Sequence, residues 1–273
     1  MIVVTAATGE FGRLVTDRLL EKLPASEVAV AVRDVDKARN LADRSIDVRH
    51  GDYDQPDSLR AAFEGADRLL FISSSSGDST ERMRQHGNVI DAARAAGVGL
   101  VAYTSALGAG FTGQGALADH NATERALRES GLPYLMLRHP IYSDSFIQSL
   151  QAVIDAGELT SSARGRGMNT ATRADLAEAA AALMTSEDQA GKSYNFTGPL
   201  WKFQDLAQVL SEIAGQPIAY REVDVDEGVM TMIGGPVRAG MFEYQTGDLE
   251  RALGHPATKF ETAVKAALQT TDA

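Results

Sequence analysis

Short apolar runs alternate with amphipathic stretches through the first half of this chain, and this rhythm restricts the fold more than any other feature. Runs this short and this apolar are typical of strands buried on both faces of a parallel sheet. The stretches between them have helical spacing, so that a helical crossover joins each strand to the next. We therefore predict an α/β fold with a doubly wound, Rossmann-like parallel sheet. The predicted strands are IVVT, VAVAV, IDV, LLFIS, LVAYTS and YLML, beginning at Ile2, Val28, Ile46, Leu69, Leu100 and Tyr134.

The turn after the first apolar run has the position of a dinucleotide-binding loop. It reads TAATGEFG, with Ala6, Gly9 and Gly12 at the places where such loops commonly carry three glycines. A turn between the first strand and the first helix presents backbone N–H groups and the positive end of a helix dipole to a pyrophosphate. Gly9 would let the backbone approach the phosphates, and Gly12 would let helix and strand pack closely. Ala6 costs about 1 to 2 kcal/mol if its backbone has to be left-handed, and little if φ is negative.

The second apolar run ends at Arg33, where an NAD-binding protein commonly has an acidic residue for the ribose 2′-hydroxyl. A guanidinium at this place binds the 2′-phosphate of NADP. A charge-assisted hydrogen bond worth about 1.5 to 3 kcal/mol corresponds to a preference of roughly ten- to hundredfold. We therefore predict NADPH as the cofactor. The alternative is that Arg33 only pairs with Asp34 or Asp36 on the surface.

The alternation of short apolar runs and amphipathic stretches ends after Arg138, and a smaller mixed α/β lobe is expected there. It would contain a helix near Phe146 to Ala156, an alanine-rich helix over residues 175–184, and strands over residues 193–197 and 218–223. We predict an NADP-binding Rossmann-like domain over residues 1–137. Residues 138–273 would form a substrate-binding lobe that is interleaved with this domain and does not fold independently.

Composition excludes several classes of function. The net charge of −11, without a cluster of Lys and Arg, argues against a nucleic acid or an anionic membrane as a partner. The chain has no cysteine, which excludes disulfide bonds, thiol catalysis and thiolate metal sites. No metal site is expected, because His50, His86 and His255 show no ligand pairing. Without a basic leader or an apolar run of roughly 20 residues, a cytoplasmic protein is expected.

One common catalytic arrangement is missing. Many short-chain dehydrogenases use Tyr-x-x-x-Lys, in which the lysine lowers the pKa of the tyrosine so that its proton reaches a carbonyl. None of the seven tyrosines here is followed four positions later by lysine, and no lysine occurs between Lys37 and Lys192. The sequence therefore argues against carbonyl reduction by that relay.

Motifs along nearly the whole chain resemble those of the NmrA-like atypical short-chain dehydrogenases, and within them the type 2 NADPH:quinone oxidoreductases. The family usually has glycine where Ala6 stands, and a different sequence at His139-Pro140. The matching stretches are TAATGEFG, AVRDVDKA, GDYDQPDSL, FISSSS, AYTSAL, LADHNATERAL, RHPIY, ATRADLAEAAA and YNFTGP.

The resemblance implies a cofactor laid across the carboxyl ends of the strands, where ligands of open α/β sheets bind. For the serine loop after the fourth strand, residues 73–76, the alternative is a flexible polar loop without a ligand. The implied cofactor-binding residues are Ala6, Thr8, Gly9, Glu10, Phe11, Gly12, Arg33, Ser73, Ser74, Ser75, Thr104 and Ser105.

The resemblance also implies two residues beside the substrate. His120 would face the nicotinamide or polarise a substrate oxygen, although a lone helical histidine is more often a surface or supporting group. Tyr142 would stack on the substrate or hydrogen-bond to it, and its alternative is an ordinary amphipathic rim residue.

The leading hypothesis for function is hydride transfer from NADPH to a quinone, an acceptor electrophilic enough to need no Tyr/Lys relay. Water or His120 would supply the protons. Two alternatives remain open: a non-catalytic NADP(H) sensor that regulates a partner protein, and a reductase of azo or triphenylmethane dyes. A homodimer is possible.

Overall fold

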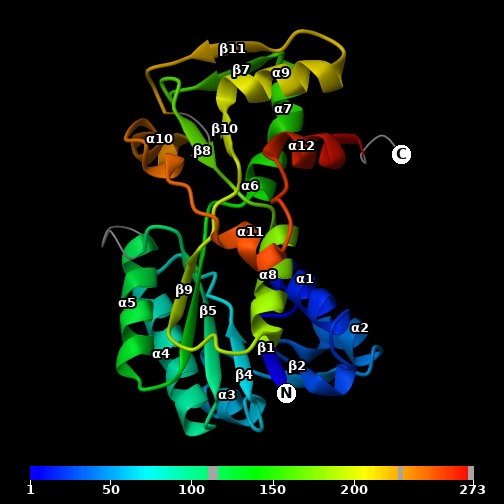
Figure 1. Cartoon of the computed structure of the whole chain (residues 1–273), viewed down its shortest axis with the longest axis vertical. Helices are drawn as coiled ribbons and strands as arrows, with labels where there is room; N and C mark the ends of the chain where they lie inside the picture. The colour runs from blue at the N-terminus through cyan, green and yellow to red at the C-terminus, as the bar shows by residue number, and fades with distance from the viewer. Residues whose placement is uncertain (110–115, 227–229, 270–273) are drawn as a thin grey trace. The chain divides into compact units, whose positions relative to one another are not determined.

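The computed structural model describes residues 1–109, 116–226 and 230–269, and the chain forms two compact units (Figure 1). The first unit contains Met1–His139 and Leu176–Asn195. The second contains Pro140–Asp175 and Phe196–Ala273. The chain therefore passes from one unit to the other three times along its sequence.

A seven-stranded sheet forms the centre of the first unit, in the order β3-β2-β1-β4-β5-β6-β9. Every pairing between neighbouring strands is parallel, and β1 pairs Ile2 with Val28 of β2 and with Arg68 of β4. The predicted doubly wound sheet is confirmed, with its strand order reversing beside β1. The strands are β1 (Ile2–Thr5), β2 (Val28–Val32), β3 (Asp47–His50), β4 (Arg68–Phe71), β5 (Leu100–Ala106), β6 (Tyr134–His139) and β9 (Lys192–Asn195).

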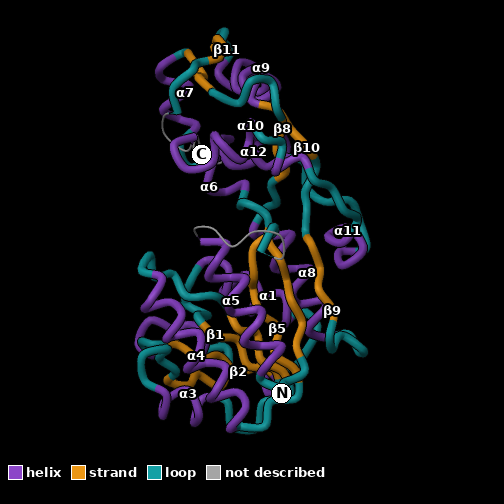
Figure 2. The backbone as a smooth tube through the Cα atoms, turned by 90° about the vertical axis from the view of Figure 1, so that its left-hand side faces the viewer, coloured by secondary structure: helices purple, strands orange, loops and turns teal. Residues whose placement is uncertain are grey.

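Helices flank this sheet (Figure 2). On one face α3, α4 and α5 pack against the strands and bury a core that includes Phe63, Val89 and Leu127. On the other side, α1 and α8 lie close enough for Arg18 to pair with Glu178 at 3.7 Å. The helices are α1 (Glu10–Leu20), α2 (Arg39–Ala42), α3 (Pro56–Ala62), α4 (Ser79–Ala95), α5 (Ala116–Glu129) and α8 (Arg173–Thr185), with short 3₁₀ turns at Ala25–Glu27 and Val35–Ala38.

The observed division of the chain differs from the predicted boundary between residues 137 and 138. Residues 176–195 belong to the first unit, because β9 adds to the main sheet beside β6, pairing Leu137 with Tyr194. The helix before it, α8, is buried along much of its length, with alanines 177, 179, 180 and 181 fully inaccessible. The strand predicted over residues 193–197 thus extends the Rossmann-like sheet instead of belonging to the smaller lobe.

The second unit is a mixed α/β lobe with two small sheets, as predicted for the second half of the chain. β10 pairs with β8 in antiparallel fashion, and β11 pairs with β7 in parallel. Trp201 stacks on Phe260 at a centroid separation of 4.0 Å in its core. The elements are α6 (Ser143–Ile147), α7 (Leu150–Ala156), β7 (Glu158–Ser161), β8 (Gly167–Asn169), β10 (Leu200–Lys202), α9 (Phe203–Ala214), β11 (Ala219–Glu222), α10 (Met230–Arg238), a 3₁₀ turn (Met241–Glu243), α11 (Asp248–Leu253) and α12 (Phe260–Gln269).

A search of the described residues finds no helix with the length and apolar character needed to cross a membrane.

Candidate functional site

The turn after β1 requires a left-handed residue, and that residue is Ala6. Its φ is +50°, and two backbone hydrogen bonds of 3.0 Å hold it there, from Ala6 N–H to Ala31 O and from Gly9 N–H to Ala6 O. The costly case that the sequence left open is therefore the one observed. Alanine at this position costs about 1 to 2 kcal/mol relative to a residue at ease in the left-handed region.

Close packing explains the glycine at position 12. A Cβ on Gly12 would lie 2.5 Å from Ala6 O and 2.8 Å from the Ala7 Cα, so any side chain would push the turn away from α1. Gly9 forms the N-cap of α1 and makes no side-chain hydrogen bond to it, and the start of a helix directs backbone N–H groups and the positive end of the helix dipole toward an anion. This arrangement fits the pyrophosphate of a dinucleotide.

The other predicted residues of the turn lie at the start of α1. Thr8 is half-buried, whereas Glu10 is exposed and begins the helix. Phe11 is buried, with its ring edge-to-face against His139 at a centroid separation of 5.1 Å. Phe11 thus contributes packing at the carboxyl end of the sheet, and a contact with the cofactor stays a prediction for all three residues.

Arg33 follows the last residue of β2 and is exposed. The acidic neighbours that would compete for it are engaged elsewhere, since Asp34 pairs with Lys37 at 3.7 Å and Asp36 with Arg39 at 2.9 Å. Within the described chain Arg33 forms no ion pair or hydrogen bond. The surface pairing with Asp34 or Asp36 is therefore not observed, and binding of a 2′-phosphate by the Arg33 guanidinium stays a prediction.

The serine loop between β4 and α4 is held by hydrogen bonds to its backbone. Ser73 N–H donates to Thr104 Oγ1 at 2.9 Å, and Ser74 N–H donates to Nε2 of His86 at 2.9 Å. Ser76 N–H donates to Ser74 Oγ at 3.1 Å. The structure thus brings Ser73, Ser74 and Thr104 together at the carboxyl edge of the sheet, and the exposed Ser75 follows Ser74 in the loop.

Several of the predicted hydroxyl groups bond within the protein. Ser74 Oγ donates to the side-chain oxygen of Gln85, and Ser105 Oγ donates to Glu124 Oε1 at 2.7 Å. A hydroxyl has only one proton to donate. Ser74 and Ser105 therefore shape the edge of the sheet, and direct donation by them to a cofactor stays an untested prediction.

A buried ion pair lies below Ser105. Glu124 is 1% exposed and accepts two hydrogen bonds from Arg138, at 2.8 and 2.7 Å, and one from Arg128 at 2.8 Å. Burial opposes the charged form of the carboxyl, but the bonds from Arg138 and Ser105 outweigh it and hold the pKa of Glu124 below its usual value. This cluster ties α5 to the ends of β5 and β6.

His120 lies on α5 and is partly exposed. Its Nδ1 is 2.8 Å from the hydroxyl of Tyr103, which lies fully buried on β5. Burial and then the nearby Arg82 guanidinium lower the pKa of His120 to about 4, against the opposing effect of Asp119 and Glu124. His120 is therefore neutral at pH 7.

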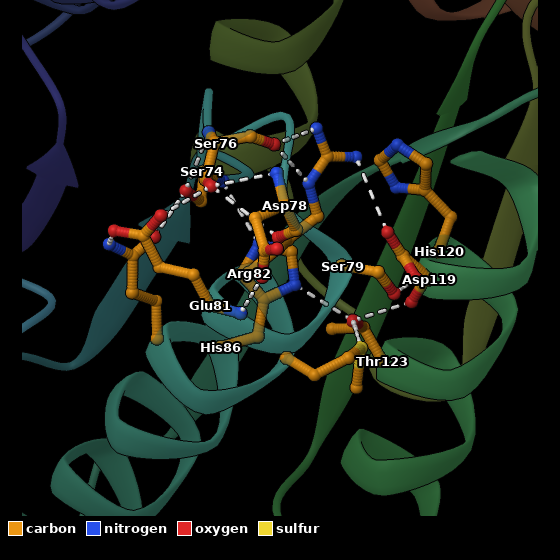
Figure 3. A network of polar contacts seen from close by, with 12 residues as sticks. Ser74, Ser76, Asp78, Ser79, Glu81, Arg82, His86, Asp119, His120 and Thr123 are labelled. Atoms are coloured by element: carbon orange, nitrogen blue, oxygen red, sulfur yellow. Dashed lines mark hydrogen bonds and ion pairs between the residues drawn. The ribbon is translucent and has the colours of Figure 1, made fainter. Parts of the chain in front are cut away.

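His86 organises a polar network between α4 and α5 (Figure 3). Its Nε2 accepts from Ser74 N–H, and its Nδ1 lies 2.8 Å from Thr123 Oγ1. Arg82 donates through Nε and Nη2 to Ser76 O at 3.0 and 2.6 Å and lies 4.0 Å from Asp119. Burial lowers the pKa of His86 to about 3, so that this histidine is a neutral structural group.

Tyr142 belongs to the second unit, immediately before α6. The guanidinium of Arg173 lies over its ring, 4.8 Å from the centroid. Burial raises the pKa of Tyr142 to about 12. A role for Tyr142 beside the substrate stays a prediction.

Sequence reasoning missed His86 and Glu124, although helical spacing carries a signal for both. His86 falls between Met83 and Val89 on the apolar stripe of α4, and Glu124 falls three residues before the fully buried Leu127 on α5. A polar residue on a buried helix face needs a hydrogen-bonding partner, and here all the partners except Arg128 lie on other elements. In the described part of the chain, no group of three or more His, Cys, Asp or Glu side chains could hold a metal ion.

The chain is similar to known reductases over nearly its full length. Residues 6–187 match a family model described as "NAD(P)H-binding". Quinone oxidoreductase 2 of Escherichia coli (strain K12) is 34% identical over 281 residues, which cover 97% of each protein.

Two solved structures extend this similarity to the fold. Triphenylmethane reductase of Citrobacter sp., complexed with NADP(H), has a TM-score of 0.91 and 37% identity, over 98% of this chain and 100% of that one. The NADPH-dependent quinone oxidoreductase QOR2 of Escherichia coli, complexed with NADPH, has a TM-score of 0.89 and 33% identity, over 98% and 99%. The glycine N-cap of α1, the close-packed turn and the family match agree, and the chain therefore belongs to the NAD(P)H-binding family, in the NmrA-like group that its motifs resemble.

Proposed function

We propose that this protein is an NADPH-dependent oxidoreductase that transfers a hydride to a quinone. The observation that carries the proposal is the similarity to quinone oxidoreductase 2, which is 34% identical over 97% of both chains. A match of this extent covers both units and not the dinucleotide-binding unit alone.

The chemistry of the site is consistent with a quinone as acceptor. Reduction of a quinone to a hydroquinone consumes one hydride, which the reduced nicotinamide supplies, and one proton. The chain has no Tyr-x-x-x-Lys relay, and His120 is neutral at pH 7. An electrophilic quinone needs positioning more than acid catalysis, so that water serves as the proton source.

The residues of the first unit would divide the binding between them. The backbone amides at the start of α1 would hold the pyrophosphate, and Arg33 would bind the 2′-phosphate that distinguishes NADPH from NADH. The serine loop and the Thr104-Ser105 end of β5 would form the surface on which the nicotinamide half rests. His120 is proposed as the residue of this unit beside the acceptor, and a substrate contact of Tyr142 in the second unit stays a separate prediction.

A triphenylmethane dye is the second candidate acceptor. The triphenylmethane reductase of Citrobacter sp. is 37% identical to this chain, with a TM-score of 0.91, which supports this alternative. Quinones and these dyes are both flat, conjugated and electrophilic. One site of this kind is therefore able to accept either, and the rates decide which is preferred.

The decisive experiment is anaerobic oxidation of NADPH by the purified protein, with NADH assayed beside it. The acceptors are a panel of soluble quinones and one triphenylmethane dye, and cofactor absorbance is followed. We expect turnover with NADPH and quinone well above the protein-free rate, at a higher kcat/KM than with the dye. No turnover with any acceptor, while NADPH binding is measured in the same sample, would contradict the proposal and favour a non-catalytic sensor.

A homodimer and a cytoplasmic location are also part of the proposal. Sedimentation of the purified chain with and without NADPH tests the first, and cell fractionation tests the second.

A further inference from the structure

The hydroxyl of Tyr103 lies within hydrogen-bond distance of the His120 ring. Neither the sequence motifs nor the similar proteins give Tyr103 a role. The distance from Tyr103 Oη to His120 Nδ1 is 2.8 Å, and the two rings lie 5.8 Å apart at an interplanar angle of 40°. Among the described residues, this is the one hydrogen bond to the His120 ring. Nε2 is therefore the nitrogen that a ligand would meet.

The direction of this bond follows from counting protons in the neighbouring network (Figure 3). Ser74 N–H can only donate, so His86 Nε2 accepts and the proton of this neutral ring is on Nδ1. His86 Nδ1–H then donates to Thr123 Oγ1 at 2.8 Å, and the Thr123 hydroxyl donates its one proton to Asp119 O at 2.8 Å.

The Tyr103 hydroxyl therefore acts as a hydrogen-bond donor and needs an acceptor. Thr123, which also lies beside the Tyr103 hydroxyl, has no proton left to donate to it. The imidazole nitrogen of His120 is a more basic acceptor than the hydroxyl oxygen of Thr123. The phenol therefore donates to His120 Nδ1, and the proton of the imidazole resides on Nε2.

Both partners are neutral at physiological pH, as this arrangement requires. Burial raises the pKa of Tyr103 above its usual value. The charged groups that face the His120 ring are Arg82 from α4 and Asp119 and Glu124 from α5. The buried His139 on β6 interacts with the ring as well, and burial keeps His139 neutral by lowering its pKa to about 3.

We propose that Tyr103 is a positioning residue that holds His120 in the tautomer protonated at Nε2, so that His120 offers the electron acceptor a hydrogen-bond donor and not a base. The inference rests on the proposed function, because it takes the acceptor to bind beside His120. A donor at this place stabilises the negative charge that develops on a quinone oxygen as the hydride arrives at the ring. The proton that completes the hydroquinone comes from water, and His120 keeps its own.

Nitrogen NMR tests the tautomer without any turnover. The full chain is labelled with ¹⁵N-histidine, long-range ¹H–¹⁵N spectra are recorded at pH 7 with and without NADP⁺, and the signals of His120 are assigned by their loss in His120→Gln. We expect a protonated Nε2 and an unprotonated Nδ1 in the wild type. A proton on Nδ1 in the wild type would overturn the proposal.

Two tyrosine variants test whether Tyr103 sets this state. In Tyr103→Phe the ¹⁵N chemical shifts of His120 Nδ1 and Nε2 should move toward the values expected for a mixture of the two tautomers. The matched control is Tyr134→Phe, which removes a hydroxyl from the neighbouring strand β6. It should leave the His120 chemical shifts unchanged. A wild-type spectrum in Tyr103→Phe, with the protein folded, would also overturn the proposal.

Kinetics tests the donor role. Tyr103→Phe should lower kcat with a soluble quinone about tenfold, the effect of losing one well-placed hydrogen bond, and leave KM for NADPH unchanged. His120→Gln keeps an N–H donor and should retain more kcat than His120→Leu, and equal rates in these two variants would refute donation. If no variant and no wild-type sample reduces a quinone while the spectra are as expected, the proposed function fails and the assignment of the tautomer stands.

Discussion

Replacing Ala6 by glycine tests whether the turn after β1 is strained. Ala6 has a φ of +50°, and its backbone N–H and C=O are both engaged, with Ala31 and Gly9. Relief of the left-handed alanine should return about 1 to 2 kcal/mol. The greater freedom of glycine in the unfolded chain costs about 0.4 to 1 kcal/mol. The expected net change is therefore a gain of about 0 to 1.6 kcal/mol in the free energy of unfolding, with a midpoint of about 0.8 kcal/mol.

Two control variants make this measurement specific. Gly97 has a φ of +69°, and a Cβ added there would meet nothing within 4 Å, so Gly97→Ala should lose about as much stability as Ala6→Gly gains. Ala7 is fully buried and is not among the described residues with positive φ. Ala7→Gly should therefore destabilise the protein, because it loses a buried methyl group and gains only freedom in the unfolded chain.

Urea unfolding of the cofactor-free protein, followed by circular dichroism, measures all three changes. A loss of stability in Ala6→Gly, with Gly97→Ala destabilised as expected, would refute the inference of strain at position 6. Affinity for NADPH should change less than tenfold in Ala6→Gly, because the bonds that shape the turn come from the backbone and not from the methyl group.

Three further predictions concern the edge of the sheet. Arg33→Ala should remove the preference for NADPH over NADH, seen as the ratio of the two dissociation constants, and an unchanged ratio would refute the 2′-phosphate assignment. Thr104→Val leaves the Ser73 N–H without its acceptor, so it should cost about 1 to 3 kcal/mol in unfolding free energy, whereas Thr104→Ser should cost less. His86 has a folded pKa of about 3, so its contribution to stability is present above pH 6.5 and is lost as pH falls toward 3. His86→Gln should therefore make the fall in unfolding free energy between pH 6 and 4 shallower by about 1 kcal/mol per pH unit, and equal slopes in variant and wild type would contradict this.

Most of the sheet could be predicted from the sequence because β1, β2, β4, β5 and β6 are largely apolar and buried. The place of β9 could not be predicted in the same way. Its residues are half-buried or exposed, and nothing in its local pattern distinguishes the open edge of β6 from a strand of the smaller lobe. Pairing across a long connection leaves no local mark on a sequence.

The candidate site shows the same limit. Arg33 could be found because the residue after the second strand of such a sheet commonly contacts the ribose of the cofactor, so that its charge indicates the kind of cofactor. In the described chain the Arg33 guanidinium forms no ion pair, since Asp34 and Asp36 pair with other residues. Most partners of His86 and Glu124 could not be found, because they lie on other elements: the serine loop and Thr123 for the first, Arg138 and Ser105 for the second. Only Arg128, which also donates to Glu124, lies on the same helix at helical spacing. A buried polar side chain predicts that a partner exists, but not which residue it is.

The hydrogen bonds at the edge of the sheet indicate how the site would recognise its cofactor. The hydroxyl groups of Ser74 and Ser105 donate to Gln85 and Glu124, so their protons are directed into the protein. The groups proposed to bind the dinucleotide are of another kind, namely the backbone amides at the start of α1 and the guanidinium of Arg33. Amides and a guanidinium suit phosphates. The hydroxyl groups would then act by fixing the shape of the loop, so that their loss should affect unfolding free energy before it affects the choice between NADPH and NADH.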